Sequence, residues 1–141
     1  MDRATKNVLV VDDEDLVRRL ARRMLTDAGY HVVEAAHGRE ALEIVARGDP
    51  AIDLVVTDVV MPDIDGRELG LRLGRNAPRL PIAYISAFSA SDIFHRGSPR
   101  PEAPFLQKPF NAVQLVALVD GLLLPVEAPR NSPARGEASA E

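Results

Sequence analysis

The chain has 141 residues, a length typical of one domain, and 46% of them are hydrophobic. Its 17 basic and 21 acidic side chains give a net charge of −4, which argues against direct nucleic-acid binding, and the absence of cysteine excludes disulfides and thiolate metal sites. No apolar run is long enough to span a bilayer and the first residues lack a secretory pattern, so we expect a cytoplasmic protein with no membrane association.

Apolar runs alternate with amphipathic stretches in the first half of the chain. Residues 7–11 predict a buried strand, and residues 14–28 repeat apolar side chains at helical spacing. A strand over residues 31–35 and a helix over residues 38–47 follow, and a glycine stands just after each of the two helices, where glycine commonly ends one. A third apolar run, residues 52–56, ends at Thr57 and Asp58.

The second half continues the alternation with more punctuation. A loop with Pro62 and Gly66 leads to a predicted helix over residues 67–76, and residues 81–85 predict a strand. Prolines and a glycine after residue 96 keep a fourth helix, residues 89–96, short. Residues 105–107 predict a brief strand, and Asn111 can cap a last helix that runs to about residue 124. Residues 125–141 hold three prolines and no apolar period, so we expect a disordered tail.

Five strand–helix units predict one α/β domain over residues 1–124, a parallel sheet covered by helices on both faces. The carboxyl ends of parallel strands meet at one edge of the sheet, where such folds bind ligands. The polar residues at these ends are Asp12, Asp13, Asp58, Ser86 and Lys108.

Each of these residues has an ordinary alternative role. Asp12 or Asp13 could cap the first helix, with Glu14 or Asp15 favouring its dipole. Ser86 could be a satisfied loop hydroxyl, and Lys108 could be solvated. Together, three carboxylates with no histidine or cysteine favour a hard cation such as Mg²⁺. A carboxylate can accept a phosphoryl group covalently, and a lysine can neutralise its oxygens. The set therefore indicates phosphoryl transfer onto an aspartate.

The fragments "VVDDE", "VVTDVVMPDIDG", "ISA" and "FLQKPF", in this order, resemble the receiver domains of two-component response regulators over residues 8–124. The resemblance implies a flavodoxin-like doubly wound sheet of five strands in the order 2-1-3-4-5, with five helices. It also implies a phosphoprotein rather than an enzyme. Its phosphoryl donor would be a phosphohistidine on a histidine kinase or histidine phosphotransfer protein.

The resemblance assigns roles to individual positions. Asp58 would be the phosphoacceptor, and Lys108 and Ser86 would contact the phosphoryl group. Mg²⁺, for which Mn²⁺ could substitute, would bind Asp13, Asp58 and the backbone carbonyl of Val60, with Asp12 acting through a water.

Further positions concern switching and partners. Ser86 and Phe105 would form the conformational switch, and the alternative for Phe105 is an ordinary core aromatic. The Lys108–Pro109 bond is a candidate cis peptide. Arg18 and Arg22 form either a solvated basic face or a docking surface for the phosphoryl donor. We expect a downstream protein target and a monomer or weak homodimer.

Two other functions compete with the phosphoacceptor. A degenerate receiver would act as an unphosphorylated scaffold, which the complete acid set, Ser86 and Lys108 argue against. A Mg²⁺ phosphatase of the haloacid-dehalogenase type needs a DxD pair after its first strand. The pair here is the adjacent Asp12 and Asp13.

Overall fold

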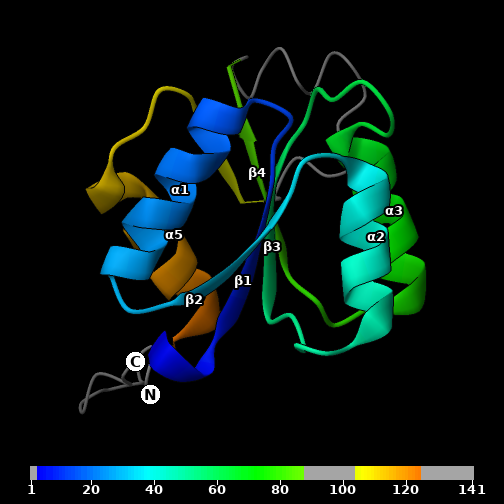
Figure 1. The fold of residues 1–141 in the computed structure, drawn as a ribbon, viewed down its shortest axis with the longest axis horizontal. Coiled ribbons are helices and arrows are strands. Elements are labelled where there is room, and N and C mark those ends of the chain that lie inside the picture. The colour runs from blue at the N-terminus through cyan, green and yellow to red at the C-terminus, as the bar shows by residue number, and fades with distance from the viewer. Residues whose placement is uncertain (1–2, 88–103, 125–141) are drawn as a thin grey trace, which may run out of the picture.

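The computed structural model describes residues 3–87 and 104–124, which form a five-stranded parallel sheet between two layers of helices (Figure 1). The strand order is β2-β1-β3-β4-β5, which confirms the predicted fold class and order. The predicted helix over residues 89–96 and the predicted disordered tail lie outside the described residues. The strands are β1 (Asn7–Val11), β2 (His31–Ala35), β3 (Leu54–Asp58), β4 (Ile82–Ser86) and β5 (Phe105–Gln107).

Helices cover both faces of the sheet, as a parallel sheet requires. The helices α1 (Asp15–Asp27) and α5 (Ala112–Leu123) pack on one face, and α2 (Gly38–Arg47) and α3 (Gly66–Asn76) on the other (Figure 1). Alternate residues of β1 enter the two cores: Leu9 and Val11 face α2 and α3, whereas Val8 and Val10 face α1 and α5. The four side chains are fully buried, so β1 reads as a continuous apolar run.

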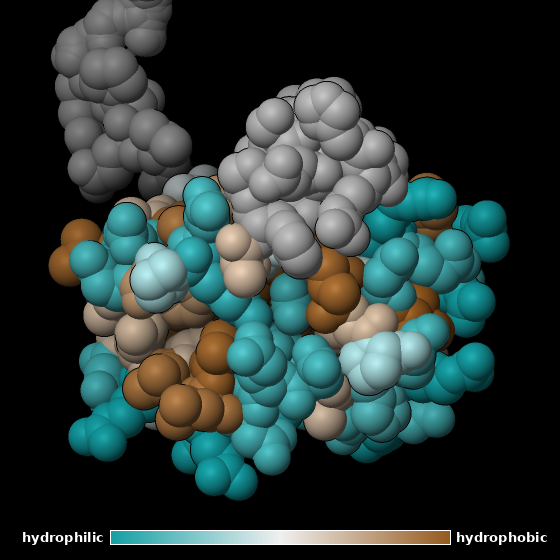
Figure 2. Space-filling view, turned by 90° about the horizontal axis from the view of Figure 1, so that it is seen from above, coloured by the Kyte–Doolittle hydropathy of each residue, from teal (hydrophilic) through white to brown (hydrophobic). Residues whose placement is uncertain are grey.

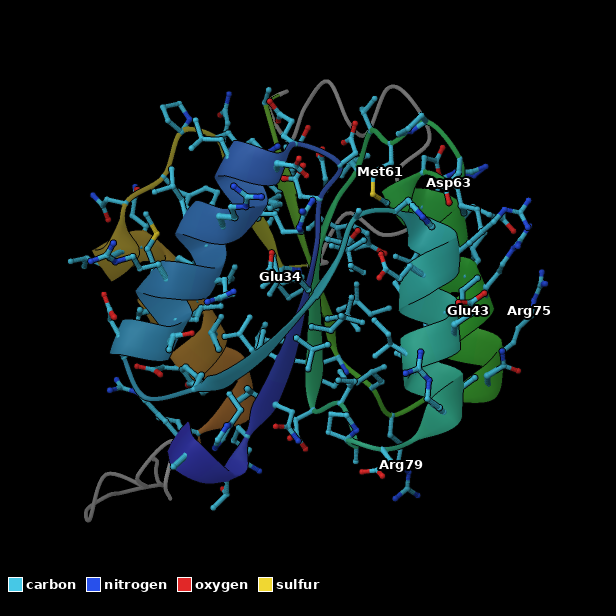
Figure 3. The ribbon with its side chains drawn as sticks, viewed as in Figure 1. Glu34, Glu43, Met61, Asp63, Arg75 and Arg79 are labelled. Carbon is cyan, nitrogen blue, oxygen red and sulfur yellow. The ribbon has the colours of Figure 1, made fainter. Side chains whose placement is uncertain are left out.

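Short-range signals set most helix ends where the sequence predicted them. Asn111 caps α5 in a capping box with Gln114, in which each side chain accepts a hydrogen bond from the other's backbone amide. Gly48 ends α2 with a φ of 72°, a left-handed conformation that glycine adopts without strain. Asp63 reaches α2 from the β3–α3 loop and accepts hydrogen bonds from the backbone amides of Gly38 and Arg39, at the upper end of α2 in Figure 3.

Two strands extend further toward their carboxyl ends than the sequence predicted. β3 begins two residues later than expected and includes Asp58, which pairs with Ile85 of β4. β4 includes Ser86, whose carbonyl accepts a hydrogen bond from the backbone amide of Lys108 at 2.7 Å. Hydrophobicity cannot mark these ends because the last pairing residues carry polar side chains. The polar groups therefore sit on the rigid sheet rather than on loops.

A short 3₁₀ turn, η1 (Arg3–Thr5), connects the start of the chain to α5. Arg3 donates two hydrogen bonds to the Asp120 carboxylate, at 3.1 and 2.7 Å, and the Tyr30 hydroxyl donates a third. The hydrogen bonds from Arg3 are the main reason that the pKa of Asp120 lies below its usual range. Within the described ranges, no helix is both long and apolar enough to cross a membrane.

Candidate functional site

Three strand ends converge at the carboxyl edge of the sheet. The register pairs Val11 of β1 with Thr57 of β3, so the next residues along the two strands, Asp12 and Asp58, lie side by side. Lys108 follows β5 and reaches across, with its Nζ 2.9 Å from Oδ2 of Asp12 and 3.4 Å from Oδ2 of Asp58. The side chains of Asp12, Asp58 and Lys108 are 0%, 8% and 10% exposed, so the charges lie largely out of water.

Burial and a neighbouring carboxylate shift the pKa of Asp58. Burial, followed by repulsion from Asp12, raises the pKa of Asp58 to about 6, and Lys108 opposes that rise. Burial of Lys108 disfavours its ammonium, but the attraction of the neighbouring Glu14 and Asp12 carboxylates outweighs this effect and raises the pKa of Lys108. The lysine is therefore charged, and it holds together acids that would otherwise repel one another.

The donor set fits a divalent cation. Asp12, Glu14 and Asp58 can each place one carboxylate oxygen within 4.8 Å of the others. Among the described residues, they form the group of acidic side chains close enough together to share a metal ion. Oδ1 of Asp12 accepts a hydrogen bond from the Glu14 amide at 2.9 Å, whereas its buried Oδ2 makes no aligned hydrogen bond, although Lys108 lies beside it. A buried carboxylate oxygen without an aligned donor, among oxygen ligands alone, suits a hard cation such as Mg²⁺.

The acids that lie together in the structure are not the three that the sequence placed at the strand ends. Asp13 is exposed and lies outside the cluster of Asp12, Glu14 and Asp58. Glu14, which the sequence assigned to the start of the first helix, does belong: it is the N-cap of α1 but caps nothing, and its Oε1 lies 2.8 Å from Nζ of Lys108. Only its position directly after the acid pair could have suggested this.

The predicted switch residues flank the site. Ser86 ends β4 and is 1% exposed. Phe105 pairs with Tyr84 in the β4–β5 register and packs, partly buried, against the core under α2 and α3. The Lys108–Pro109 peptide bond is cis, and so is the Asp49–Pro50 bond, which the sequence did not single out.

The two arginines of α1 differ in their surroundings. Arg18 is 11% exposed and donates to the Asp12 carbonyl at 2.8 Å, to Asp15 at 2.8 Å and to Glu34 at 3.0 Å. Arg18 is therefore mostly buried and pairs with the carboxylate of Glu34 on β2. This contact differs from both predicted roles, a solvated basic face and a docking surface. Arg22 also contacts Glu34, the β2 side chain labelled in Figure 3, but it is 56% exposed.

An apolar surface adjoins the site on the side of α1 and α5. Leu16 and Leu20 of α1 are 72% and 47% exposed, and Val113 at the start of α5 is 78% exposed. A groove of about 360 Å³ runs between α1 and the segment after β5, with Val17, Leu20 and Lys108 among its lining residues. Figure 2 looks down on the upper face of Figure 1 and shows hydrophobic side chains on both halves of that face, with the largest group on the half that holds α1 and α5.

A doubly wound sheet with buried acids and a lysine at its carboxyl edge is the arrangement of a receiver. Residues 8–120 match the family model of the response regulator receiver domain. The sensor kinase CckA of Brucella abortus is 43% identical over 117 residues, which are 82% of this chain but 12% of that protein. The response regulator receiver protein CpdR of the same organism is 33% identical over 119 residues, covering 84% of this chain and 98% of CpdR.

The solved structures agree. The response regulator protein TrrA of Thermotoga maritima, in complex with Mg²⁺ and BeF, matches with a TM-score of 0.75 and 32% identity, over 84% of this chain and 99% of that one. The chain therefore belongs to the response regulator receiver domain family. Receiver domains are phosphoacceptors that pair with histidine kinases, rather than enzymes in the usual sense.

Proposed function

We propose that Asp58 accepts a phosphoryl group from a phosphohistidine of a histidine kinase or histidine phosphotransfer protein, in a reaction that needs Mg²⁺. One observation carries the proposal: the β3 end holds Asp58 against Asp12 and Lys108, three charged side chains buried at the edge where doubly wound sheets bind ligands. If these positions served stability alone, apolar residues would suit them better, because buried charges are costly to remove from water.

Each charged residue has a part in the transfer. One Asp58 oxygen attacks phosphorus, and the bond from phosphorus to the histidine nitrogen breaks. Asp13, Asp58 and the Val60 carbonyl would hold Mg²⁺, with Asp12 acting through a water, and the cation neutralises the phosphoryl oxygens when bound. Lys108 stays charged and supplies a further positive charge at fixed position.

Phosphorylation would be read out at the neighbouring strand ends. It adds negative charge and acceptor oxygens at Asp58, and Ser86, buried at the next strand end, would turn toward them. Phe105, partly buried and in register with Tyr84, would repack in response. A downstream protein would then recognise the changed surface.

The apolar surface beside the site suits docking of the phosphoryl donor. Leu16 and Leu20 are exposed apolar side chains next to a groove that Lys108 also lines. Arg22, the more exposed of the two arginines, lies on the same helix. Exchanging Arg22 for glutamate should slow transfer from the cognate donor and leave phosphorylation by acetyl phosphate unchanged.

Acetyl phosphate tests the proposal directly. Incubation with Mg²⁺ should add one base-labile phosphate, detected by mass spectrometry, and EDTA or Asp58→Asn should abolish it. Asp27→Asn is a matched control, because Asp27 is a 72% exposed aspartate on α1. Absence of labelling at any Mg²⁺ concentration would favour an unphosphorylated scaffold, and hydrolysis of phosphate esters would favour a phosphatase.

A further inference from the structure

Glu14 makes a contact that its position in the chain does not explain. It precedes α1 as the N-cap, yet its side chain makes no capping hydrogen bond. The carboxylate instead lies 2.8 Å from Nζ of Lys108, a residue 94 positions later in the chain. The Glu14 side chain is 59% exposed and that of Lys108 only 10%, so Glu14 lies on the solvent side of the lysine.

Three carboxylates share Lys108. It donates hydrogen bonds to Glu14 at 2.8 Å and to Asp58 at 3.4 Å, and its Nζ lies 2.9 Å from Oδ2 of Asp12. The lysine is therefore closer to Glu14 than to the acid that we propose as phosphoacceptor. A phosphoryl group on Asp58 would compete with these carboxylates for the lysine.

The exposed contact is the one that can be released at least cost. Asp12 is fully buried, and losing the lysine would leave its charge out of water and unpaired. Glu14 can return to solvent, where an exposed ion pair contributes little.

We propose that Glu14 is a positioning residue that holds Lys108 until a phosphoryl group on Asp58 displaces it. Glu14 thereby slows phosphorylation and sets how readily the lysine reaches the new oxygens. The inference rests on the proposed function, because it needs Asp58 to be the phosphoacceptor.

The reaction used for the test is phosphorylation by acetyl phosphate. An Asp58 oxygen forms the new bond to phosphorus, the bond from phosphorus to the bridging oxygen breaks, and acetate leaves. Glu14→Gln keeps the shape of the side chain and removes its charge. We expect it to raise the initial rate by about two- to fivefold, the range that an exposed ion pair corresponds to. Asp15→Asn removes the neighbouring charge, which pairs with Arg18 instead, and should leave the rate unchanged.

A double-mutant cycle separates a lysine-mediated effect from general repulsion of the anionic donor. In a Lys108→Met background, Glu14→Gln should no longer raise the rate, because the lysine that it frees is absent. An equal acceleration in both backgrounds would overturn the proposal in favour of simple charge repulsion. No acceleration in the parent background would overturn it as well.

Mg²⁺ affinity, measured by calorimetry, gives a readout that does not depend on phosphorylation. If Glu14 serves the lysine, Glu14→Gln should raise the Kd for Mg²⁺ much less than Asp58→Asn does. A Kd raised as much as in Asp58→Asn would identify Glu14 as a metal ligand and overturn the proposal. A parent protein that takes up no phosphate would refute the proposed function, whereas a phosphorylated parent with an unaltered Glu14→Gln rate refutes only the positioning role.

Discussion

Replacing Lys108 with methionine tests whether a single lysine holds the buried acids of the site together. The substitution keeps an unbranched chain of similar length and removes the charge. Nζ lies 2.9 Å from Asp12 and 3.4 Å from Asp58, distances at which unit charges attract by roughly 5–6 kcal/mol each at an effective dielectric constant of about 20. The lysine's own desolvation, several kcal/mol, offsets part of this gain.

The balance predicts a large loss of stability in the absence of metal. Without the lysine, Asp12 and Asp58 repel each other at an edge where neither side chain is more than 8% exposed. We expect the free energy of unfolding in EDTA to fall by about 3–5 kcal/mol, the range found when one partner of a buried ion pair is removed.

The assay is urea unfolding followed by far-UV circular dichroism, since the chain has no tryptophan. Excess Mg²⁺ should recover part of the loss, because the cation supplies positive charge to the same acids. Lys6→Met, at the amino-terminal end of β1, should change the free energy by no more than about 0.5 kcal/mol. A Lys108→Met protein as stable as its parent in EDTA would refute this account of the site.

Three further predictions concern the scaffold around the site. Arg18→Ala should lower the free energy of unfolding by about 1–3 kcal/mol because two partly buried hydrogen bonds and one exposed hydrogen bond are lost. The exposed Arg19→Ala should be near neutral in the same urea assay. Gly66→Ala should destabilise by about 1–3 kcal/mol, since its Cβ would collide with the backbone at the end of β3, and Gly74→Ala, with nothing within 4 Å, should raise the thermal midpoint. Asp120 has a lowered pKa in the folded state, so its charge stabilises the fold above the pKa of the unfolded chain. This stabilisation is lost as the pH falls through the pKa of the folded state. Acid unfolding curves of the parent and of Asp120→Asn should therefore converge at low pH.

The sheet and the convergence of its strand ends could be predicted from local patterns. Val8–Val11 form an unbroken apolar run, which is typical of a strand buried on both faces. The register of the parallel sheet then brings Asp12 beside Asp58. The same rule places Lys108, which directly follows β5, at this edge two strands beyond β3. These predictions need the direction of each strand, which the alternation of strands and helices indicates, and the order in the sheet, which came from the resemblance to receiver domains.

The partners of long charged side chains could not be predicted in this way. Glu14 and Arg18 both stand near the start of α1, and each had a sufficient local explanation, as a helix-dipole residue and as part of a basic face. In the structure Glu14 contacts Lys108 and Arg18 contacts Glu34, and both partners come from strands or loops elsewhere in the chain. Side-chain direction at a helix end depends on tertiary neighbours, which sequence spacing does not contain.

The charge count at the carboxyl edge explains why a divalent cation belongs in the proposed reaction. Asp12, Glu14 and Asp58 contribute three negative charges in their ionised forms and Lys108 one positive charge, which leaves two negative charges in excess. A second lysine would neutralise only part of the excess and would occupy the space that the phosphoryl group needs. A divalent cation matches the excess and can share its coordination with phosphoryl oxygens, since Mg²⁺ keeps exchangeable water ligands. Burial first, and then repulsion from Asp12, raise the pKa of Asp58, so a cation that supplies positive charge would couple the reactivity of the acid to its own arrival.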